Sequence, residues 1–435
     1  MDVVPLAPRL PVELFYHVFE HSTKATLIAC STVCKQWSSM SMPYRFYDVT
    51  LWCKPIDEEI QRAEDDEVED WGPVGEESKK SLSSFLHFLK AFPLIANSIR
   101  KLNIDMRPPM GRTTVYDANH MSFVNVLRSL PQLKTLVLQD VFLPNRRSEV
   151  LTDIKLDHLV VRYPKYYARE DGAVRYNEIM RMLMLFGSVE SISLEQIYIA
   201  GADLEAGEPP FPLQSGVTSL ALRDVGSLAA LLESITRGST VDGGHAHLRR
   251  LEIYDLCEDE LHEMNTLLEI TGHQYQHFVC CIPLEVLAEG GSLILNLSRC
   301  IHLRSLVLRM RMVGAMFPTR ISNNNENAWK YLLRVLESIP FGSTPVVLDQ
   351  LTLNIHFTPG FNPKSRYIQR GDLQKVAPQI TAVEGRLLEW VEKGFIRSVR
   401  IEFARDEGEE ATLDATLMSE FLSRLHNTGI LSLSK

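Results

Sequence analysis

The sequence predicts an α/β protein in which a short three-helix region at the N-terminus precedes a long, irregular solenoid. The chain has 435 residues, which is too many for one ordinary compact core. Apolar residues keep helical spacing between residues 10 and 37, and a different apolar motif recurs along the rest of the chain. Because each repeat unit hides its apolar side only against its neighbours, we expect parallel strands on one face and helices on the other.

The composition limits the function classes. Hydrophobic residues make up 45% and charged residues 23% of the chain, which is enough for a packed core. The formal net charge of -10 disfavours general nucleic-acid binding, and no apolar run or signal-peptide pattern indicates a membrane partner. Seven cysteines without regular spacing suit a reducing compartment. We therefore expect a cytoplasmic and/or nuclear protein that binds neither nucleic acid nor membrane.

The first helical region is expected to hold three short helices. Pro11 suits the first turn of the first helix, and Glu13 favours its positive end. Ser22 or Thr23 can cap the second helix. The apolar positions of the three helices are Leu14, Phe15, Val18, Phe19, Leu27, Ile28, Val33, Cys34 and Trp37. A core this small needs cover from the rest of the chain or from a partner.

Four segments follow from these patterns: an N-terminal tail at 1–8, the helices with a lead-in strand at 9–52, an acidic linker or loop at 53–81, and the solenoid at 82–435. Between Asp57 and Asp70 nine residues are acidic and one is basic. Such a segment repels itself, so we expect a solvated loop. The alternative interpretation is an acidic segment that attracts a basic partner.

The prediction of a solenoid depends on a recurring motif with the spacing apolar-x-x-apolar-x-apolar. We interpret each copy of this motif as one strand. Eleven copies begin at Phe46, Ile99, Leu133, Leu156, Val189, Val217, Leu248, Tyr275, Leu303, Leu348 and Ile396. The intervals leave room for a helix after most strands. We expect an irregular arc with inserted loops, including Pro108 to Asn119, Ala200 to Pro212 and Asn323 to Asn327.

One face of the strands is a candidate substrate surface. The fourth and sixth residues after the first apolar position point away from the core, so they form lines along the array. These lines include Arg162, Arg223, Tyr254, Arg309 and, two residues further, Arg311. Arg and Tyr are favoured in binding hot spots, and this face could accept an acidic or phosphorylated segment. The alternative is an ordinary solvated sheet face.

Signals for catalysis and metal binding are weak. The chain has no phosphate-binding Gly-rich motif, nucleophile elbow or His-Glu-x-x-His helix. Cys30 and Cys34, or the group from His273 to Cys281, could in principle hold a metal, but neither set has paired Cys-x-x-Cys spacing. We therefore expect no catalytic residue, no metal and no cofactor; an enzyme of another class stays as a remote alternative.

Two segments carry a family resemblance. Leu-Pro-Val-Glu-Leu at 10–14 and Val-Cys-Lys-Gln-Trp at 33–37 resemble an F-box, in the variant common in fungal proteins. The apolar repeat resembles leucine-rich repeats, although each copy lacks the Asn or Cys expected three residues after its last apolar position. The stretch between Phe19 and Leu27 is also shorter than usual and lacks the usual Pro and Asp.

The F-box resemblance implies a non-catalytic subunit of a Skp-cullin-F-box ubiquitin ligase. In such a complex the F-box docks on a Skp-family adaptor, which hangs from a cullin carrying a RING subunit, and the repeats hold a protein substrate. The matching positions are Leu10, Pro11, Glu13, Leu14, Val18, Leu27, Val33 and Trp37, with 10–14 expected to touch the adaptor. Two alternatives stay open: Val18, Val33 and Trp37 could be purely internal core, and the chain could be a repeat scaffold without a role in ubiquitin transfer.

Overall fold

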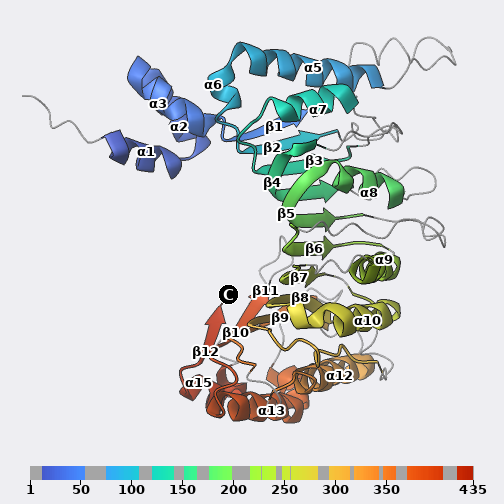
Figure 1. Cartoon of the computed structure of the whole chain (residues 1–435). Helices are drawn as coiled ribbons and strands as arrows, with labels where there is room; N and C mark the ends of the chain where they lie inside the picture. Colours follow the sequence, from blue (N-terminus) through green and yellow to red (C-terminus); the bar gives the residue numbers. More distant parts are fainter. Residues whose placement is uncertain are drawn as a thin grey trace, which may run out of the picture. The chain divides into compact units, whose positions relative to one another are not determined.

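The computed structural model describes two compact units, residues 1–192 and 193–435 (Figure 1). The described residues are 12–53, 75–106, 120–141, 151–163, 176–197, 216–226, 228–241, 247–254, 256–282, 293–313, 318–341, 346–358, 370–404 and 419–434. The acidic segment 57–70 lies outside them, as do the expected loops Pro108 to Asn119 and Ala200 to Pro212. Each unit is described by itself below.

The first unit opens with three short helices: α1 (Val12–Glu20), α2 (Lys24–Val33) and α3 (Lys35–Arg45). Thr23, not Ser22, caps α2, because its hydroxyl oxygen accepts a hydrogen bond from the Thr26 amide at 3.2 Å. The thiol of Cys34 accepts from the Trp37 amide at 3.4 Å and caps α3. The helices enclose a small core of Phe19, Leu27 and Met40, against which Phe15, Cys30, Trp37 and Tyr44 pack.

The remainder of the first unit alternates strands and helices. Its strands are β1 (Asp48–Trp52), β2 (Lys101–Asp105), β3 (Thr135–Gln139) and β4 (Leu151–Arg162), and its helices are α5 (Gly75–Ala91), α6 (Pro93–Ala96), α7 (His120–Arg128) and α8 (Tyr176–Met184). The pairs β1–β2, β2–β3 and β3–β4 are parallel. Helix α5 begins at Gly75, inside the stretch 53–81 that was expected to be a linker or loop.

The second unit continues the same pattern. Strand β5 (Phe186–Glu195) crosses the boundary between the units, and β6 (Ser219–Arg223), β7 (Arg250–Ile253), β8 (His277–Ile282), β9 (Ser305–Val313), β10 (Gln350–Thr358), β11 (Val399–Ala404) and β12 (Leu431–Ser434) follow. Each consecutive pair from β6 to β12 is parallel. The helices are α9 (Leu228–Val241), α10 (Leu261–Thr271), α12 (Pro318–Glu337), α13 (Arg370–Glu392) and α15 (Ser423–Asn427), with short 3-10 turns at Glu258–Glu260 and Gly272–Gln274. Helices α9, α10 and α12 lie along one side of the strands (Figure 1).

The predicted α/β class, with N-terminal helices followed by parallel strands and helices, is confirmed. The last two apolar residues of each of the eleven motifs lie in a strand, and outside β1 they are buried, as in Leu220 and Leu222 of β6. The loop expected at Asn323 to Asn327 is wrong, because these residues lie within α12. There Asn325 is buried and Trp329 packs one turn later, so packing overrides the low helix propensity of asparagine.

A recurrent turn follows several strands. Asp140, Gln196 and Asp224 each stand two residues past the last apolar position and have positive φ angles of 53°, 56° and 51°. The next residues, Val141, Ile197 and Val225, are buried. A buried apolar side chain thus occupies the position where leucine-rich repeats carry Asn or Cys.

Candidate adaptor-binding helices and a charged site on the sheet face

The N-terminal helices expose apolar side chains. Leu14 is 47% exposed and Val18, one turn later on α1, is 58% exposed. Val33, the last residue of α2, is 64% exposed, and Ile28 on the same helix is exposed as well. Several exposed apolar side chains on so small a helical region are typical of a region that a partner covers.

Other residues of the predicted adaptor-binding set are internal. Leu27 is 3% exposed, and the Trp37 ring meets the rings of Phe15 and Phe19 edge-on at 5.4 and 5.9 Å between centroids. The interpretation of Val18 and Val33 as internal core is wrong, because both are exposed.

The remaining members of that set lie at the start of the helical region. Leu10 and Pro11 lie outside the described residues, whereas Glu13 belongs to α1. Of the five positions whose side chains the structure describes, Leu14, Val18 and Val33 are exposed, Leu27 is buried in the small core and Trp37 packs against it.

The helical region is tied to the repeats by aromatic contacts. Phe46, which caps the end of α3, lies 6.4 Å from Phe88 of α5 between ring centroids. Phe88 in turn lies 6.3 Å from Phe85 and 5.1 Å from Phe92. The end of α3 is thus packed against α5 through the contact between Phe46 and Phe88.

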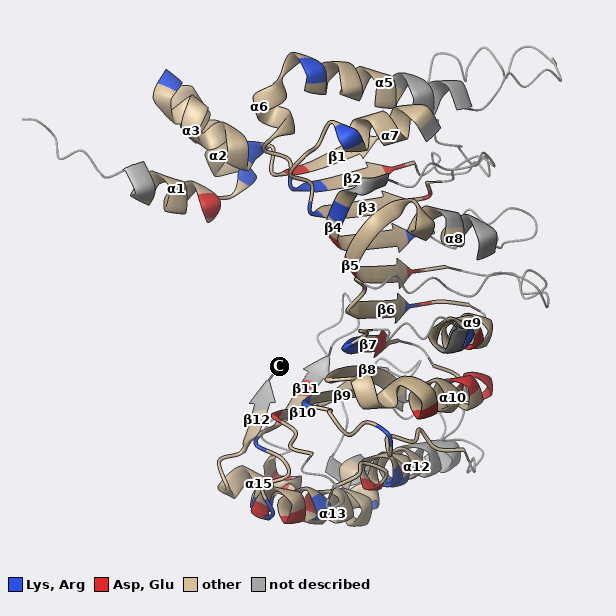
Figure 2. Ribbon diagram, in the orientation of Figure 1, with Lys and Arg blue, Asp and Glu red and all other residues tan. Residues whose placement is uncertain are grey.

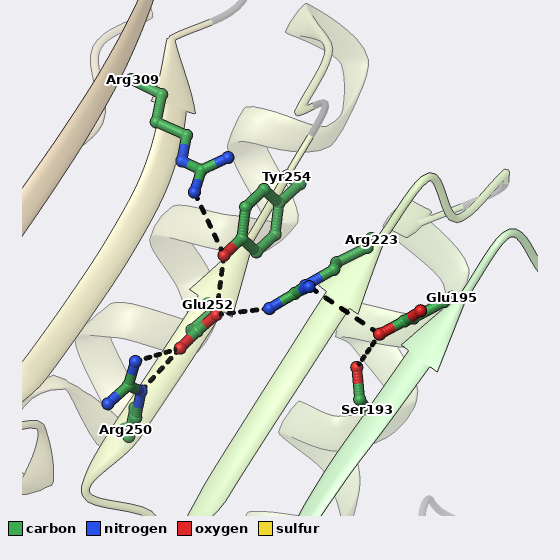
Figure 3. A network of polar contacts seen from close by, with 7 residues as sticks. All are labelled: Ser193, Glu195, Arg223, Arg250, Glu252, Tyr254 and Arg309. Atoms are coloured by element: carbon green, nitrogen blue, oxygen red, sulfur yellow. Dashed lines mark hydrogen bonds and ion pairs between the residues drawn. The ribbon is translucent and has the colours of Figure 1, made fainter. Parts of the chain in front are cut away.

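On the sheet face of the second unit, three residues predicted from the strand pattern meet. Arg223 ends β6, Tyr254 follows β7 and Arg309 lies on β9. The guanidinium carbons of Arg223 and Arg309 lie 4.7 and 4.1 Å from the centre of the Tyr254 ring, which stands between them (Figure 3). Both arginines thereby make cation–π contacts with one ring.

Glu252 binds this group from β7. Its Oε1 accepts a hydrogen bond from Arg250 Nε at 2.6 Å and forms an ion pair with Arg250 Nη2 at the same distance. Its Oε2 accepts from the Tyr254 hydroxyl at 2.8 Å and from Arg223 Nη2 at 3.4 Å (Figure 3). Glu252 is only 6% exposed. Strand β7 accordingly carries basic and acidic residues next to one another along the ribbon (Figure 2).

The protonation states follow from these contacts. Burial by itself would raise the pKa of Glu252, but hydrogen bonds from Tyr254 and Arg250 and the charges of Arg250 and Arg223 outweigh it, so the pKa lies below its ordinary value. Burial and the hydrogen bond to Glu252 raise the pKa of Tyr254. The carboxylate is therefore charged and the phenol neutral at physiological pH.

Glu195 of β5 completes the group on the other side of Arg223. Its Oε1 lies 3.8 Å from Arg223 Nη1 and accepts a hydrogen bond from the Ser193 hydroxyl at 2.9 Å. Three guanidinium groups, those of Arg223, Arg250 and Arg309, thus face two carboxylates. Among the described residues Arg309 makes no ion pair.

The other two predicted residues, Arg162 and Arg311, are not among the contacts of this group that the structure describes. Arg162 ends β4 in the first unit, where its carbonyl oxygen accepts a hydrogen bond from the Asp140 amide at 2.9 Å. Arg311 belongs to β9, but its side chain lies outside the described part of the chain.

The acidic partners Glu195 and Glu252 were not predicted, although the strand spacing marks both positions. Glu195 is the sixth residue after Val189, and Glu252 is the fourth after Leu248. Both therefore occupy the outward lines from which only Arg and Tyr were selected. Attention to opposite charge on neighbouring strands would have found them.

The described segments contain no group of three or more metal-ligating side chains and no helix long and apolar enough to cross a membrane. All seven cysteines are free. Burial raises the pKa of Cys53 and of Cys300 to about 12, so neither thiol is a ready nucleophile.

Comparison with known families gives a match for the region of the N-terminal helices. Residues 7–54 match the F-box-like family model, and this stretch includes α1, α2, α3 and β1. A search of curated proteins found no match to the chain. The chain thus carries an F-box-like domain, a module that generally binds Skp-family adaptors and suggests a general adaptor role in Skp-cullin-F-box ubiquitin ligases.

Proposed function

We propose that this protein is the substrate-recognition subunit of a Skp-cullin-F-box ubiquitin ligase. The match of residues 7–54 to the F-box-like family carries the proposal, and the exposed Leu14, Val18 and Val33 support it. The helices dock on a Skp-family adaptor, through which a cullin and a RING subunit join. The repeat region, which we interpret as leucine-rich-repeat-like, binds a protein substrate. The setting is the cytoplasm and/or nucleus, and the F-box variant is of the fungal type.

The chain itself performs no bond chemistry in this function. It holds the substrate near a ubiquitin-charged conjugating enzyme, which raises the effective concentration of substrate lysines at the reacting thioester. Two separate surfaces are required, one for the adaptor and one for the substrate. The apolar helical surface and the charged sheet face supply two surfaces of different chemistry.

The adaptor surface is apolar. Leu10 and Pro11 belong to it by the F-box motif, and Leu14 and Val18 extend it along α1. Burying one such side chain against a partner stabilises the complex by roughly 1.5–3 kcal/mol. Leu27 and Trp37 act indirectly, because they hold the helices in place from the core.

The substrate surface is assigned to the outward residues of the strands, Arg162, Arg223, Tyr254, Arg309 and Arg311. Arg223, Tyr254 and Arg309 form one contiguous group. Arginine and tyrosine supply large, partly rigid contact areas at binding hot spots. The substrate is therefore expected to meet the second unit at β6 to β9.

The adaptor contact is tested with Leu14→Glu. This change places a charge on the apolar surface, so we expect affinity for a purified Skp-family adaptor to fall at least about tenfold, while the fold persists because Leu14 is half exposed. Calorimetry measures the affinity, and circular dichroism verifies that the variant is folded.

Met121→Glu is the matched control, since Met121 is equally apolar and exposed but lies on α7. It should bind the adaptor as the wild type does. A folded wild-type protein that fails to bind the adaptor would overturn the ligase function. The alternative, a repeat scaffold whose N-terminal helices only cap the repeats through contacts such as Phe46 with Phe88, would then be favoured.

A further inference from the structure

The charged group on the sheet face carries one more positive than negative charge. Glu252 is shared by Arg223 and Arg250, and Glu195 adds a second contact to Arg223. On β11, which β10 separates from β9, Glu402 is already paired with Arg400 at 2.9 Å. The excess charge therefore resides on Arg309, in a chain whose formal net charge is -10.

Arg309 has donors without a partner among the residues that the structure describes. A guanidinium carries five N–H donors, and within the described part of the chain the Arg309 side chain makes one hydrogen bond, from Nη2 to the Tyr254 hydroxyl at 3.4 Å. Its Nε is buried without a hydrogen-bond partner. Across the strand pair, Asn354 lies opposite Arg309 on β10 and donates to Glu402; its amide is neutral and brings no charge to Arg309.

Tyr254 holds this guanidinium in place. The ring stacks against Arg309 at 4.1 Å and is itself fixed by its hydrogen bond to the buried Glu252. A side chain held in this way loses little conformational entropy when it binds a ligand, and its parallel N–H groups fit the two oxygens of a carboxylate or phosphate.

We propose that Arg309 binds the oxyanion of a peptide side chain, a carboxylate or a phosphate ester, on the sheet face of the second unit, with Tyr254 and Glu252 as its positioning residues. This inference rests on the proposed substrate-binding role and gives the substrate a chemical class. The bound segment presents an acidic or phosphorylated residue to β9, on the side of the Tyr254 ring opposite the paired Arg223.

The test uses the full chain and three fluorescein-labelled peptide pools. Each pool has random flanks and a fixed central residue, which is phosphoserine, glutamate or serine, and fluorescence anisotropy measures binding. We expect the wild type to bind a pool with an anionic centre at least about tenfold more tightly than the serine pool. Binding of the phosphoserine pool alone identifies a phosphate site, and binding of both anionic pools shows that a carboxylate suffices.

Arg309→Gln should reduce binding of the anionic pools to the level of the serine pool. Arg304→Gln is the matched control, because Arg304 is exposed and directly precedes β9, and the variant loses the same charge at a position outside the group. The affinities of this variant for the three pools should stay within about twofold of those of the wild type. Circular dichroism verifies that both are folded. Equal anisotropy for the three pools, including no binding of any pool, or a preference that survives Arg309→Gln, overturns the proposal.

Adaptor binding of the same variants separates the two proposals. Arg309→Gln should bind a Skp-family adaptor as the wild type does, because Arg309 lies far along the chain from the F-box-like helices. A protein that prefers anionic peptides but binds no adaptor retains this site and loses the ligase function. A protein that binds the adaptor but shows no preference among the pools retains the ligase function and loses this site.

Discussion

Glu252 keeps a charged carboxylate in a nearly buried position because four donor groups surround it. Arg250 supplies two of them, and Tyr254 and Arg223 supply the others. Removing one partner of such a buried group leaves the rest uncompensated, which destabilises more than the loss of an exposed ion pair. Glu252 therefore contributes to the stability of the sheet as well as to the position of Tyr254.

Glu252→Gln should lower the free energy of unfolding at pH 7 by about 2 kcal/mol, because charge-assisted hydrogen bonds become neutral ones. The pKa of Glu252 is lowered in the folded protein, so its stabilising contribution is fully present above the ordinary glutamate pKa. That contribution is lost as the pH falls through the lowered value. Urea unfolding of both proteins between pH 7 and pH 3 should show the difference shrinking.

Glu269→Gln serves as the control for this measurement. Its ion pair with Arg299 is long, at 4.0 Å, and both side chains are exposed, so stability should change by less than about 0.5 kcal/mol at any pH. A difference for Glu252→Gln that stays constant from pH 7 to pH 3 would contradict the ionised carboxylate.

At the scale of residues, the sequence predicts on which face of the sheet a side chain lies better than it predicts which side chains contact one another. Arg223, Tyr254 and Arg309 follow from a strand period of two combined with a repeat register. Their packing against one ring depends on which strands are neighbours and on side-chain reach, and neither is encoded in the local pattern. Whether these residues bind a substrate is still a prediction.

At the scale of elements, side chains from α10 and α12 pin a stretch without regular structure before β9. Asn265 of α10 donates to the Ile294 carbonyl and accepts from the Asn296 amide, both at 2.8 Å. Tyr331 of α12 accepts from the Leu295 amide at 3.0 Å, and Ser338, just after α12, accepts from the Leu297 amide at 2.9 Å. These bonds satisfy backbone groups that lack a strand or helix partner.

Asn265→Ala should lower the free energy of unfolding by about 2 kcal/mol, because two backbone groups lose their partner at once. Equilibrium urea unfolding measures the change. Thr266→Ala, on the next residue, is the control. Within the described part of the chain the Thr266 hydroxyl donates to the His262 carbonyl one turn back and to nothing else, so we expect a change below about 0.5 kcal/mol. Equal effects of the two variants would show that Asn265 does not hold the segment.

The elements that were not predicted have identifiable causes. Strand β12 carries Leu431 and Leu433, but Thr428 stands where the motif requires a first apolar residue. In α13 the buried residues Leu373, Val376, Ile380, Val383 and Leu387 keep helical spacing. That helix nevertheless contains Pro378, which in sequence is a signal for a helix end. Tertiary packing thus overrides both local signals, the polar Thr428 before β12 and the proline inside α13.

At the scale of the whole molecule, the core is a set of apolar ladders rather than one centre. In the second unit Leu220, Leu251 and Phe278 stand opposite one another on successive strands, and each is fully buried. Every strand therefore packs chiefly on its two neighbours in the sheet. The stability of such an array is approximately a sum of local contributions and nearest-neighbour contacts.

This architecture predicts that core damage stays local. Leu251→Ala removes a buried side chain from β7 and should destabilise the second unit by roughly 2–5 kcal/mol. Hydrogen exchange followed by mass spectrometry should show the largest loss of protection in β6, β7 and β8, because these strands share the ladder position. Strands β11 and β12 should retain most of their protection.

Val399→Ala gives the reciprocal measurement, since Val399 is buried on β11 between Leu351 of β10 and Leu431 of β12. Its loss of protection should centre on β10 to β12 and spare β6. If both variants instead raise exchange uniformly across the second unit, its strands unfold as one cooperative body. In that case the ladders would be coupled beyond nearest neighbours, and a substrate bound at β6 to β9 would stabilise β12 as strongly as the strands that it touches.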